Sequence, residues 1–230
     1  MKTVAIIPAR GGSKRIPRKN IRPFCGKPII HYPISIAIES GLFDEVMVST
    51  DDQEIAGVAA QGGASVPFLR SAAASNNTAV TADVISEVLR SYQENGVEFD
   101  RLCCIYPVTP LLQAKHLKEA VAILENDNVE SVQPVVRFGF PPQRALRVLP
   151  DGRVSWIYSE HALTRSQDLE VQYHDVGQFY WWKTVHFLKE KLLVGKNSFA
   201  YEMSELDIQD IDNEADWQLA EQKYRLRITQ

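Results

Sequence analysis

The sequence predicts an α/β fold in which a mainly parallel sheet carries helices on both faces. The first observation is a set of short apolar runs, rich in β-branched residues and bounded by Asp, Pro, Gly or Thr, which are typical of buried strands. These runs are TVAIIPA (residues 3–9), EVMVST (45–50), RLCCIYP (101–107) and ESVQPVV (130–136). The second observation is that helical patterns separate the runs, and this alternation indicates crossover units between parallel strands. Ligands of such sheets bind at the carboxyl ends of the strands.

Apolar residues at helical spacing form three groups between these runs, each on one helix face. The groups are Ile34, Ala37 and Ile38; Ala82, Ile85, Val88 and Leu89; and Leu117, Val121 and Leu124. Farther along, GQFYWW (residues 177–182) resumes the strand pattern and KTVHFLKEK predicts a short helix. An amphipathic helix over residues 213–224 is expected to close the fold.

Residues 137–175 break this alternation. The segment is dense in Pro, Gly, Arg and aromatic residues, and PDG at residues 150–152 is a good hairpin turn. It is also rich in apolar side chains, which do not favour a free linker. We therefore predict a single domain over residues 1–230 with an inserted β-rich arm at about residues 137–175.

Composition and charge exclude some function classes. The 230 residues are 45% hydrophobic, and 25 basic against 29 acidic side chains give a net charge of -4, which argues against a general nucleic-acid or membrane-surface binder. Residues 1–38, however, hold eight Lys or Arg and no Asp or Glu. Three cysteines without CxxC spacing, and the lack of a signal-peptide or membrane-span pattern, lead us to expect a reduced, cytoplasmic protein.

The basic excess surrounds a loop in IIPARGGSKRIPRKN, residues 6–20. Two glycines allow backbone amides to point at an anion, and a hydroxyl and three cations flank them. The loop residues concerned are Arg10, Gly11, Gly12, Ser13, Lys14 and Lys19. Neither the GxxxxGK[ST] nor the GxGxxG pattern is present. A solvated basic face or a nucleic-acid patch is the alternative, but the position directly after a buried strand favours a polyphosphate site.

This loop, together with GKPII (residues 26–30), VSTDDQEIA (48–56) and IQDIDNEADWQLAE (208–221), resembles the CMP-sialic acid synthetase family of cytidylyltransferases. The resemblance covers the chain from end to end. It implies a Rossmann-like nucleotidyltransferase α/β domain with a small dimerisation arm, and therefore a homodimer. It also implies transfer of CMP from CTP to a nine-carbon sugar acid, with release of pyrophosphate and with Mg²⁺ as cofactor.

The resemblance assigns roles to the residues that match the family motifs. Arg10 and Lys14 would lie near the phosphates as catalytic residues, with Lys19 beside them. Asn20 and Arg70 would hold the cytosine, with Thr81 near the base. Asp210, also catalytic, and Asp212 would bind magnesium, which prefers one or two carboxylates plus phosphate oxygens and water. From the residues alone, Asp212 or Asn213 is also a good N-cap for the closing helix, and Asp51 and Asp52 are expected to be caps.

Some positions depart from the family pattern. HDVG (residues 174–177) stands where RPNG is usual, Arg15 replaces a glycine, and Tyr106 replaces a glutamine of sialate-activating members. FPPQRAL, RSQDLE and YHDVGQFYW instead resemble the branch that activates pseudaminic acid, a relative of sialic acid. The predicted sugar contacts are Tyr106, Gln143, Arg144, Arg165, Gln167 and Gln178, although Gln178 could be an ordinary strand residue. Activation of sialic, legionaminic or another ulosonic acid, and a catalytically silent CTP-binding protein, are the alternatives.

Overall fold

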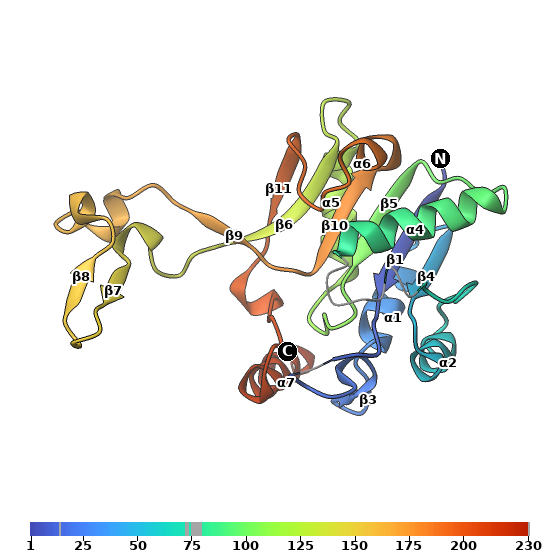
Figure 1. Ribbon diagram of the computed structural model, residues 1–230, viewed down its shortest axis with the longest axis horizontal. Coiled ribbons are helices and arrows are strands. Elements are labelled where there is room, and N and C mark those ends of the chain that lie inside the picture. Colours follow the sequence, from blue (N-terminus) through green and yellow to red (C-terminus); the bar gives the residue numbers. More distant parts are fainter. Residues whose placement is uncertain (14, 72–73, 75–79, 230) are drawn as a thin grey trace.

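A seven-stranded mixed sheet forms the centre of the protein, seen here in a computed structural model that describes residues 1–13, 15–71, 74 and 80–229. The path of the sheet is β11-β6-β10-β5-β1-β4, with β9 paired to β6 (Figure 1). Its strands are β1 (Thr3–Pro8), β4 (Glu45–Ser49), β5 (Arg101–Ile105), β6 (Ser131–Arg137), β9 (Tyr173–Asp175), β10 (Phe179–Lys183) and β11 (Ser198–Glu202). Five of them run in one direction, whereas β9 and β10 run in the other. The predicted mainly parallel sheet is confirmed.

Helices cover both faces of this sheet. They are α1 (His31–Ser40), α2 (Gln53–Gln61), α4 (Thr81–Glu94), α5 (Ala114–Leu124), α6 (Thr184–Glu190) and α7 (Glu214–Ile228). Side chains alternate along each strand, so in β1 Ala5 and Ile7 join the core of α1, α2 and α5. Val4 and Ile6 point the other way and join the core of α4 and α6. The alternation of strands and helices in the sequence therefore gave the correct layers.

Two strands of the seven-stranded sheet were not expected from the sequence. Strand β11, SFAYE, lies at the edge of the sheet and pairs in parallel with β6. Its Phe199 is 44% exposed, because an edge strand is only partly covered and does not need the continuous apolar run of a central strand. The short β9 is exposed along its whole length. Neither strand has the sequence pattern used to find the others.

The last helix packs against the first loop. The core cluster between them includes Ile16, Phe24 and Trp217, and the Phe24 and Trp217 rings meet edge-on with centroids 5.6 Å apart. Arg22 lies over the Trp217 ring at 4.3 Å and forms two hydrogen bonds with Glu214, at 2.7 and 2.8 Å. Segments near the two ends of the chain are thereby held side by side.

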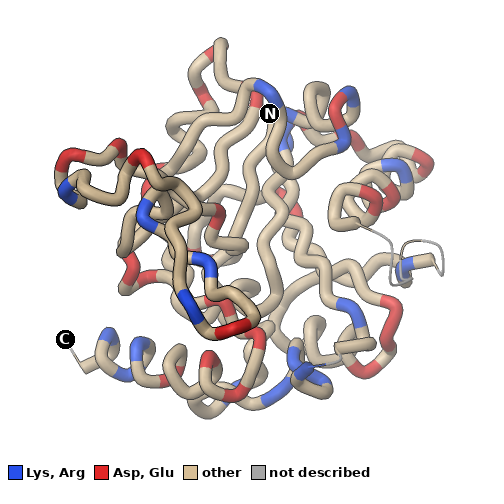
Figure 2. The backbone as a smooth tube through the Cα atoms, turned by 60° about the vertical axis from the view of Figure 1, so that its left-hand side comes forward, with Lys and Arg blue, Asp and Glu red and all other residues tan. Residues whose placement is uncertain are grey.

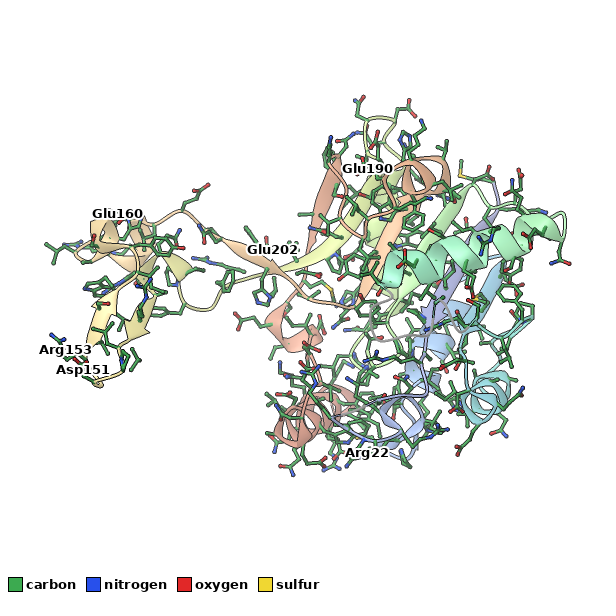
Figure 3. All side chains as sticks on the ribbon, viewed as in Figure 1. Arg22, Asp151, Arg153, Glu160, Glu190 and Glu202 are labelled. Atoms are coloured by element: carbon green, nitrogen blue, oxygen red, sulfur yellow. The ribbon has the colours of Figure 1, made fainter. Side chains whose placement is uncertain are left out.

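The predicted inserted segment is an arm that extends away from the sheet (Figure 1). Its far end is a hairpin of β7 (Leu146–Val148) and β8 (Val154–Trp156), in which Gly152 has φ +83° and Leu149 N–H donates to the Arg153 carbonyl at 2.8 Å. Figure 3 shows Asp151 and Arg153, an ion pair at 2.7 Å, together at the tip. The PDG turn is where the sequence predicted it.

The ends of the arm differ from the prediction by a few residues. Arg137 still belongs to β6, and residues 173–175 form β9, which pairs with β6 in antiparallel register. The chain therefore leaves the sheet and returns to it at one place, and the projecting part is residues 138–172.

Charges of both signs are distributed over the molecule in Figure 2. In the part of the chain that the structure describes, no helix has the length and apolar character needed to cross a membrane.

Candidate active site

A cleft of about 460 Å³ opens where β1, β4 and β5 end, as the fold class predicts. Its lining residues come from six places in the chain. They are Pro8, Arg10, Ser13, Arg15, Ile16, Lys19, Asn20, Arg70, Ala74, Thr81, Val84, Tyr106, Pro107, Val108, Gly177, Asp210 and Ile211. Four cations and one carboxylate are among these described residues, so the cleft is suited to a polyanion.

The first loop is shaped by Asn20. This side chain is 4% exposed and its Nδ2 donates to the Arg10 carbonyl at 2.9 Å, while the backbone carbonyl of Asn20 accepts the Ile30 N–H. These bonds return the loop to the end of β1 and place Arg10 at the cleft. Contact of Asn20 with cytosine stays a prediction, and the structure gives this side chain a role in loop geometry.

The amide of Gly11 does not have the anion-binding orientation that the sequence predicted. Gly11 N–H donates to Asp51 Oδ1 at 3.0 Å, so in this structure it does not point at a free anion position. The expectation that Asp51 caps the following helix is wrong, because its neighbour Asp52 occupies that position. A Cβ on Gly11 would lie 2.7 Å from Asp52 Oδ2, which explains the need for glycine here.

Asp52 connects the first loop to helix α2. Its Oδ1 accepts the N–H groups of Glu54 and Ile55 at 3.0 Å, and its carboxylate binds the Arg18 guanidinium at 2.5 and 3.1 Å. The hydrogen bond from Arg18 lowers the pKa of Asp52 to about 2. Because Asp52 is the N-cap of α2, the same carboxylate starts the helix and holds the loop.

Lys19 connects the loop to the acidic segment before α7. Its Nζ donates to the Ile211 carbonyl at 2.6 Å, between Asp210 and Asp212. Burial lowers the pKa of Lys19, and the charges of those two aspartates act against that shift. A cation held between the loop and the predicted metal ligands is well placed to meet a phosphate group.

The predicted metal ligands flank Ile211, whose carbonyl accepts a hydrogen bond from Lys19. Burial and the neighbouring Asp212 carboxylate raise the pKa of Asp210, so a cation between them would favour the ionised form. Arg15 binds both oxygens of Asp212, at 2.8 and 2.5 Å. Asn213, not Asp212, is the N-cap of α7, which resolves the cap alternative without testing the metal role.

These two carboxylates fit magnesium. Hard oxygen donors at positions i and i+2 beside a polyanion site are the ligands that Mg²⁺ takes when substrate phosphates and water complete its shell. The described residues contain no cluster of three or more such ligands, so a dedicated protein cage is absent there.

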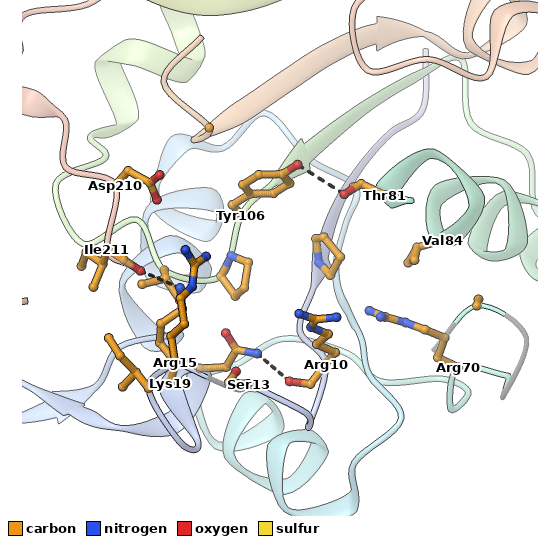
Figure 4. Close-up of a pocket in the computed structure, with 17 residues that line it drawn as sticks. Arg10, Ser13, Arg15, Lys19, Arg70, Thr81, Val84, Tyr106, Asp210 and Ile211 are labelled. Carbon is orange, nitrogen blue, oxygen red and sulfur yellow. Dashed lines mark hydrogen bonds between the residues drawn. The ribbon is translucent and has the colours of Figure 1, made fainter. Parts of the chain in front are cut away.

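Arg70 is buried, with 9% exposure, because its guanidinium is held by the end of β4. Its Nε donates to Ser49 Oγ at 3.1 Å and a terminal nitrogen donates to the Ser49 carbonyl. Burial lowers its pKa, and the charge of Arg10 acts in the same direction. Figure 4 shows the Arg70 guanidinium pointing toward Arg10, an arrangement that an anion between them would stabilise.

Thr81 and Tyr106 form the opposite wall (Figure 4). Thr81 is the first residue of α4, and its Oγ1 lies 3.3 Å from the Tyr106 hydroxyl. Burial raises the pKa of Tyr106 to about 12, so this hydroxyl keeps its proton at neutral pH. Both predicted residues therefore line the cleft.

The other predicted sugar contacts are not among the described lining residues. Gln178 lies directly before β10, is 2% exposed and donates from Nε2 to the Asp207 carbonyl at 3.2 Å, which favours a structural residue over a sugar contact. Gln143 donates to the Glu170 carbonyl within the arm, and Arg144 lies over Trp156. Arg165 precedes a short 3-10 turn of the arm, Ser166–Asp168, and Gln167 lies within it. These four arm residues lie outside the described cleft lining of their own chain.

Lys14, Gly12 and Ser13 complete the predicted loop. Ser13 lines the cleft and Gly12 is exposed, with open space around its α-carbon. Lys14 lies outside the described residues. Arg15 lines the cleft although the sequence motif marks it only as a departure from the family pattern. The available signal for its place was that it is one of five basic residues in one short loop.

The comparison with protein families decides the class. The cytidylyltransferase family profile matches residues 4–214. The chain belongs to the cytidylyltransferase family. It is thus a CTP-dependent nucleotidyltransferase, as the motifs predicted.

Individual cytidylyltransferases are similar over nearly the whole chain. A pseudaminic acid cytidylyltransferase of Campylobacter jejuni is 38% identical over 98% of this chain and 97% of its own length. A CMP-N,N'-diacetyllegionaminic acid synthase of Legionella pneumophila is 31% identical over the same shares. A solved CMP:2-keto-3-deoxy-manno-octonic acid synthetase, complexed with CTP, covers 100% of this chain and 99% of its own, with a TM-score of 0.69 and 17% identity. That last likeness shows the fold.

Proposed function

We propose that this cytidylyltransferase transfers CMP from CTP to the anomeric hydroxyl of a nonulosonic acid, with pseudaminic acid as its acceptor. The observation that carries the proposal is a basic cleft at the carboxyl ends of β1, β4 and β5, in a chain 38% identical to a pseudaminic acid cytidylyltransferase. The HDVG sequence beside Tyr106 supports the choice of sugar, because the sialate-type RPNG is missing there.

The reaction needs position and charge more than covalent help from the protein. The anomeric hydroxyl loses its proton to solvent and its oxygen forms a bond to the α-phosphorus of CTP, while the bond from that phosphorus to the bridging oxygen of pyrophosphate breaks. Negative charge grows on the leaving pyrophosphate, and Arg10 and Lys19 stabilise it from the loop. Arg70 and Thr81 hold the nucleotide. Tyr106 bounds the space left for the sugar.

Asp210 and Asp212 would hold magnesium, for which their oxygen donors and their place beside the cations are suitable. Bound magnesium would neutralise phosphate charge. Arg15 must release Asp212 before both of its oxygens can serve this purpose.

The arm supports the proposal of a homodimer. Eleven large apolar side chains between residues 138 and 173 are more than one-third exposed, including Leu163 at 98%, Val148 at 71% and Phe140 at 65%. An exposed set of this size is unfavourable in water and is typical of an interface. In such a dimer Gln143, Arg144, Arg165 and Gln167 would approach the sugar site of the partner.

The three cysteines are free thiols, which supports a reducing cytoplasmic location.

Pyrophosphate release with CTP, magnesium and a panel of sugar acids tests this function. The panel holds pseudaminic, legionaminic and N-acetylneuraminic acids, and a reaction without sugar is the control. We expect release that depends on pseudaminic acid. Pyrophosphate release with legionaminic acid alone would mean that legionaminic acid is the acceptor. CTP binding without pyrophosphate release on any sugar would indicate a catalytically silent CTP-binding protein.

A further inference from the structure

The carboxylate of Asp175 links the place where the arm returns to the sheet with the wall of the cleft that contains Tyr106. Strand β9 ends at Asp175, and Gly177, two residues later, lines the cleft. Asp175 Oδ1 accepts the Gly177 N–H at 3.1 Å, and its Oδ2 accepts the Tyr180 hydroxyl at 2.5 Å. One side chain therefore fixes the turn and a neighbouring tyrosine together.

Tyr180 packs behind Tyr106, the residue that faces the cleft. It is 2% exposed, and its ring meets the Tyr106 ring edge-on with centroids 5.7 Å apart. Tyr106 N–H donates to the Gln178 carbonyl at 2.8 Å, which joins the end of β5 to the start of β10. A shift of Tyr180 or of the turn would move Tyr106, because the three are packed and hydrogen-bonded as one layer.

The backbone of the turn depends on the same contact. Gly177 has φ +58°, a left-handed conformation, and a Cβ there would come 3.8 Å from the Tyr106 ring. The Asp175 carboxylate holds this conformation through the Gly177 amide. Without the Asp175 carboxylate, the buried Tyr180 hydroxyl would lose its acceptor, and the turn would lose the hydrogen bond from the Gly177 amide.

We propose that Asp175 is a positioning residue for the acceptor sugar, which fixes the Tyr106–Gly177 wall through Tyr180 and the Gly177 amide. Asp175 is not itself among the described residues that line the cleft. The wall lies across the cleft from Arg10, which is assigned to the triphosphate (Figure 4), so the KM for the sugar should change more than the KM for CTP. The inference rests on the proposed function, since it assigns this wall to the sugar.

The test is a double-mutant cycle of D175A and Y180F, with initial rates measured against sugar and CTP separately. We expect D175A to raise the KM for pseudaminic acid about tenfold and Y180F about fivefold, with the KM for CTP changed less than about twofold. Both variants break the hydrogen bond between Tyr180 and Asp175. The sugar KM of the double variant should therefore stay near the D175A increase of about tenfold, well below the product of about fiftyfold.

Y201F is the matched control. It removes a tyrosine hydroxyl on β11 that donates to Glu119 at 2.5 Å, outside both the arm and the described cleft lining, so it should leave both KM values unchanged. Thermal unfolding and calorimetric CTP binding establish that each variant is folded.

Three outcomes would overturn the proposal. They are an unchanged sugar KM in both single variants, equal increases in the KM for sugar and for CTP, and multiplicative effects in the double variant. In each of these cases the wild type still turns over pseudaminic acid, so the proposed function stands. If the wild type turns over no sugar acid, the proposed function fails and this inference fails with it.

Discussion

The guanidinium of Arg15 binds both carboxylate oxygens of Asp212, across 197 positions of sequence. The pair closes the first loop onto the segment that carries the predicted metal ligands. Both side chains are partly in water, with 69% and 37% exposure, and such pairs contribute only about 0.2–1 kcal/mol. The contact is therefore weak enough for a metal or a triphosphate to displace.

Replacing Arg15 by glycine should make magnesium easier to bind. The substitution removes the competitor for Asp212, so we expect the magnesium concentration for half-maximal rate to fall by about two- to fivefold. Magnesium titration of pyrophosphate release measures this, and Mn²⁺ binding followed by electron paramagnetic resonance gives a readout independent of turnover. A higher magnesium requirement in R15G would mean that Arg15 serves the phosphates and not Asp212.

Substitution of the predicted ligands should have the opposite effect. In Asp210→Asn and Asp212→Asn a neutral amide replaces a carboxylate, a poorer ligand for a hard cation, so each variant should need more magnesium. Glu214→Gln is the control, because Glu214 pairs with Arg22 outside the cleft lining. An unchanged magnesium dependence in both aspartate variants would show that the metal site is elsewhere.

Asp52 should stabilise the fold in a pH-dependent manner. Its pKa is lowered to about 2 in the folded protein, against about 4 in an unfolded chain. Ionised Asp52 therefore favours folding above about pH 4, and this contribution is lost as the pH falls from about 4 to about 2. Solvent around the pair limits the effect to the order of 1 kcal/mol.

The measurement is the free energy of unfolding of wild type and Asp52→Asn as a function of pH. Asparagine keeps a helix N-cap but has no charge to offer Arg18. The wild type should be the more stable protein at pH 6, and the difference should shrink below pH 4. A difference that is constant from pH 6 to pH 2 would contradict the role of the ion pair.

The arm should hold two subunits together. Leu163→Asp and Phe140→Asp place a charge in the proposed interface, and burying an unpaired charge is costly, so both variants should shift the protein toward monomer. Val185→Asp is the control, because Val185 is 57% exposed on α6, outside the arm. Light scattering at assay concentration reads the mass. A fully active wild-type monomer would refute the dimer.

The sheet could be predicted because its central strands are buried on both faces and therefore read as continuous apolar runs. The strands β11 and β9, which each pair with β6, could not be predicted. An edge strand such as Ser198–Glu202 carries mixed residues and takes its position from its neighbour. The arm was found from its composition and from the PDG turn at residues 150–152. Its limits were set by the pairing of Val136 with His174, a long-range contact that local patterns do not contain.

The cleft was predicted in part. Arg10, Lys19, Arg70, Thr81, Tyr106 and Asp210 meet in one place because their motifs follow or precede strands that end at the same edge. The contact of Asp51 with Gly11 could not be foreseen, because either of two adjacent aspartates can cap a helix. Gln178 was ambiguous for a similar reason, as side-chain direction depends on the partner strand.

Catalytic efficiency with two sugars tests the central claim most directly. Pyrophosphate release is measured with CTP and magnesium, with pseudaminic acid and N-acetylneuraminic acid varied in turn, and the CMP-sugar is identified by mass spectrometry. A site that leaves polar groups of the wrong sugar unpaired can discriminate strongly, so we expect kcat/KM for pseudaminic acid to be higher by at least about a hundredfold. Comparable values for the two sugars would contradict the assigned acceptor, and no CMP-sugar from either would contradict the transfer itself.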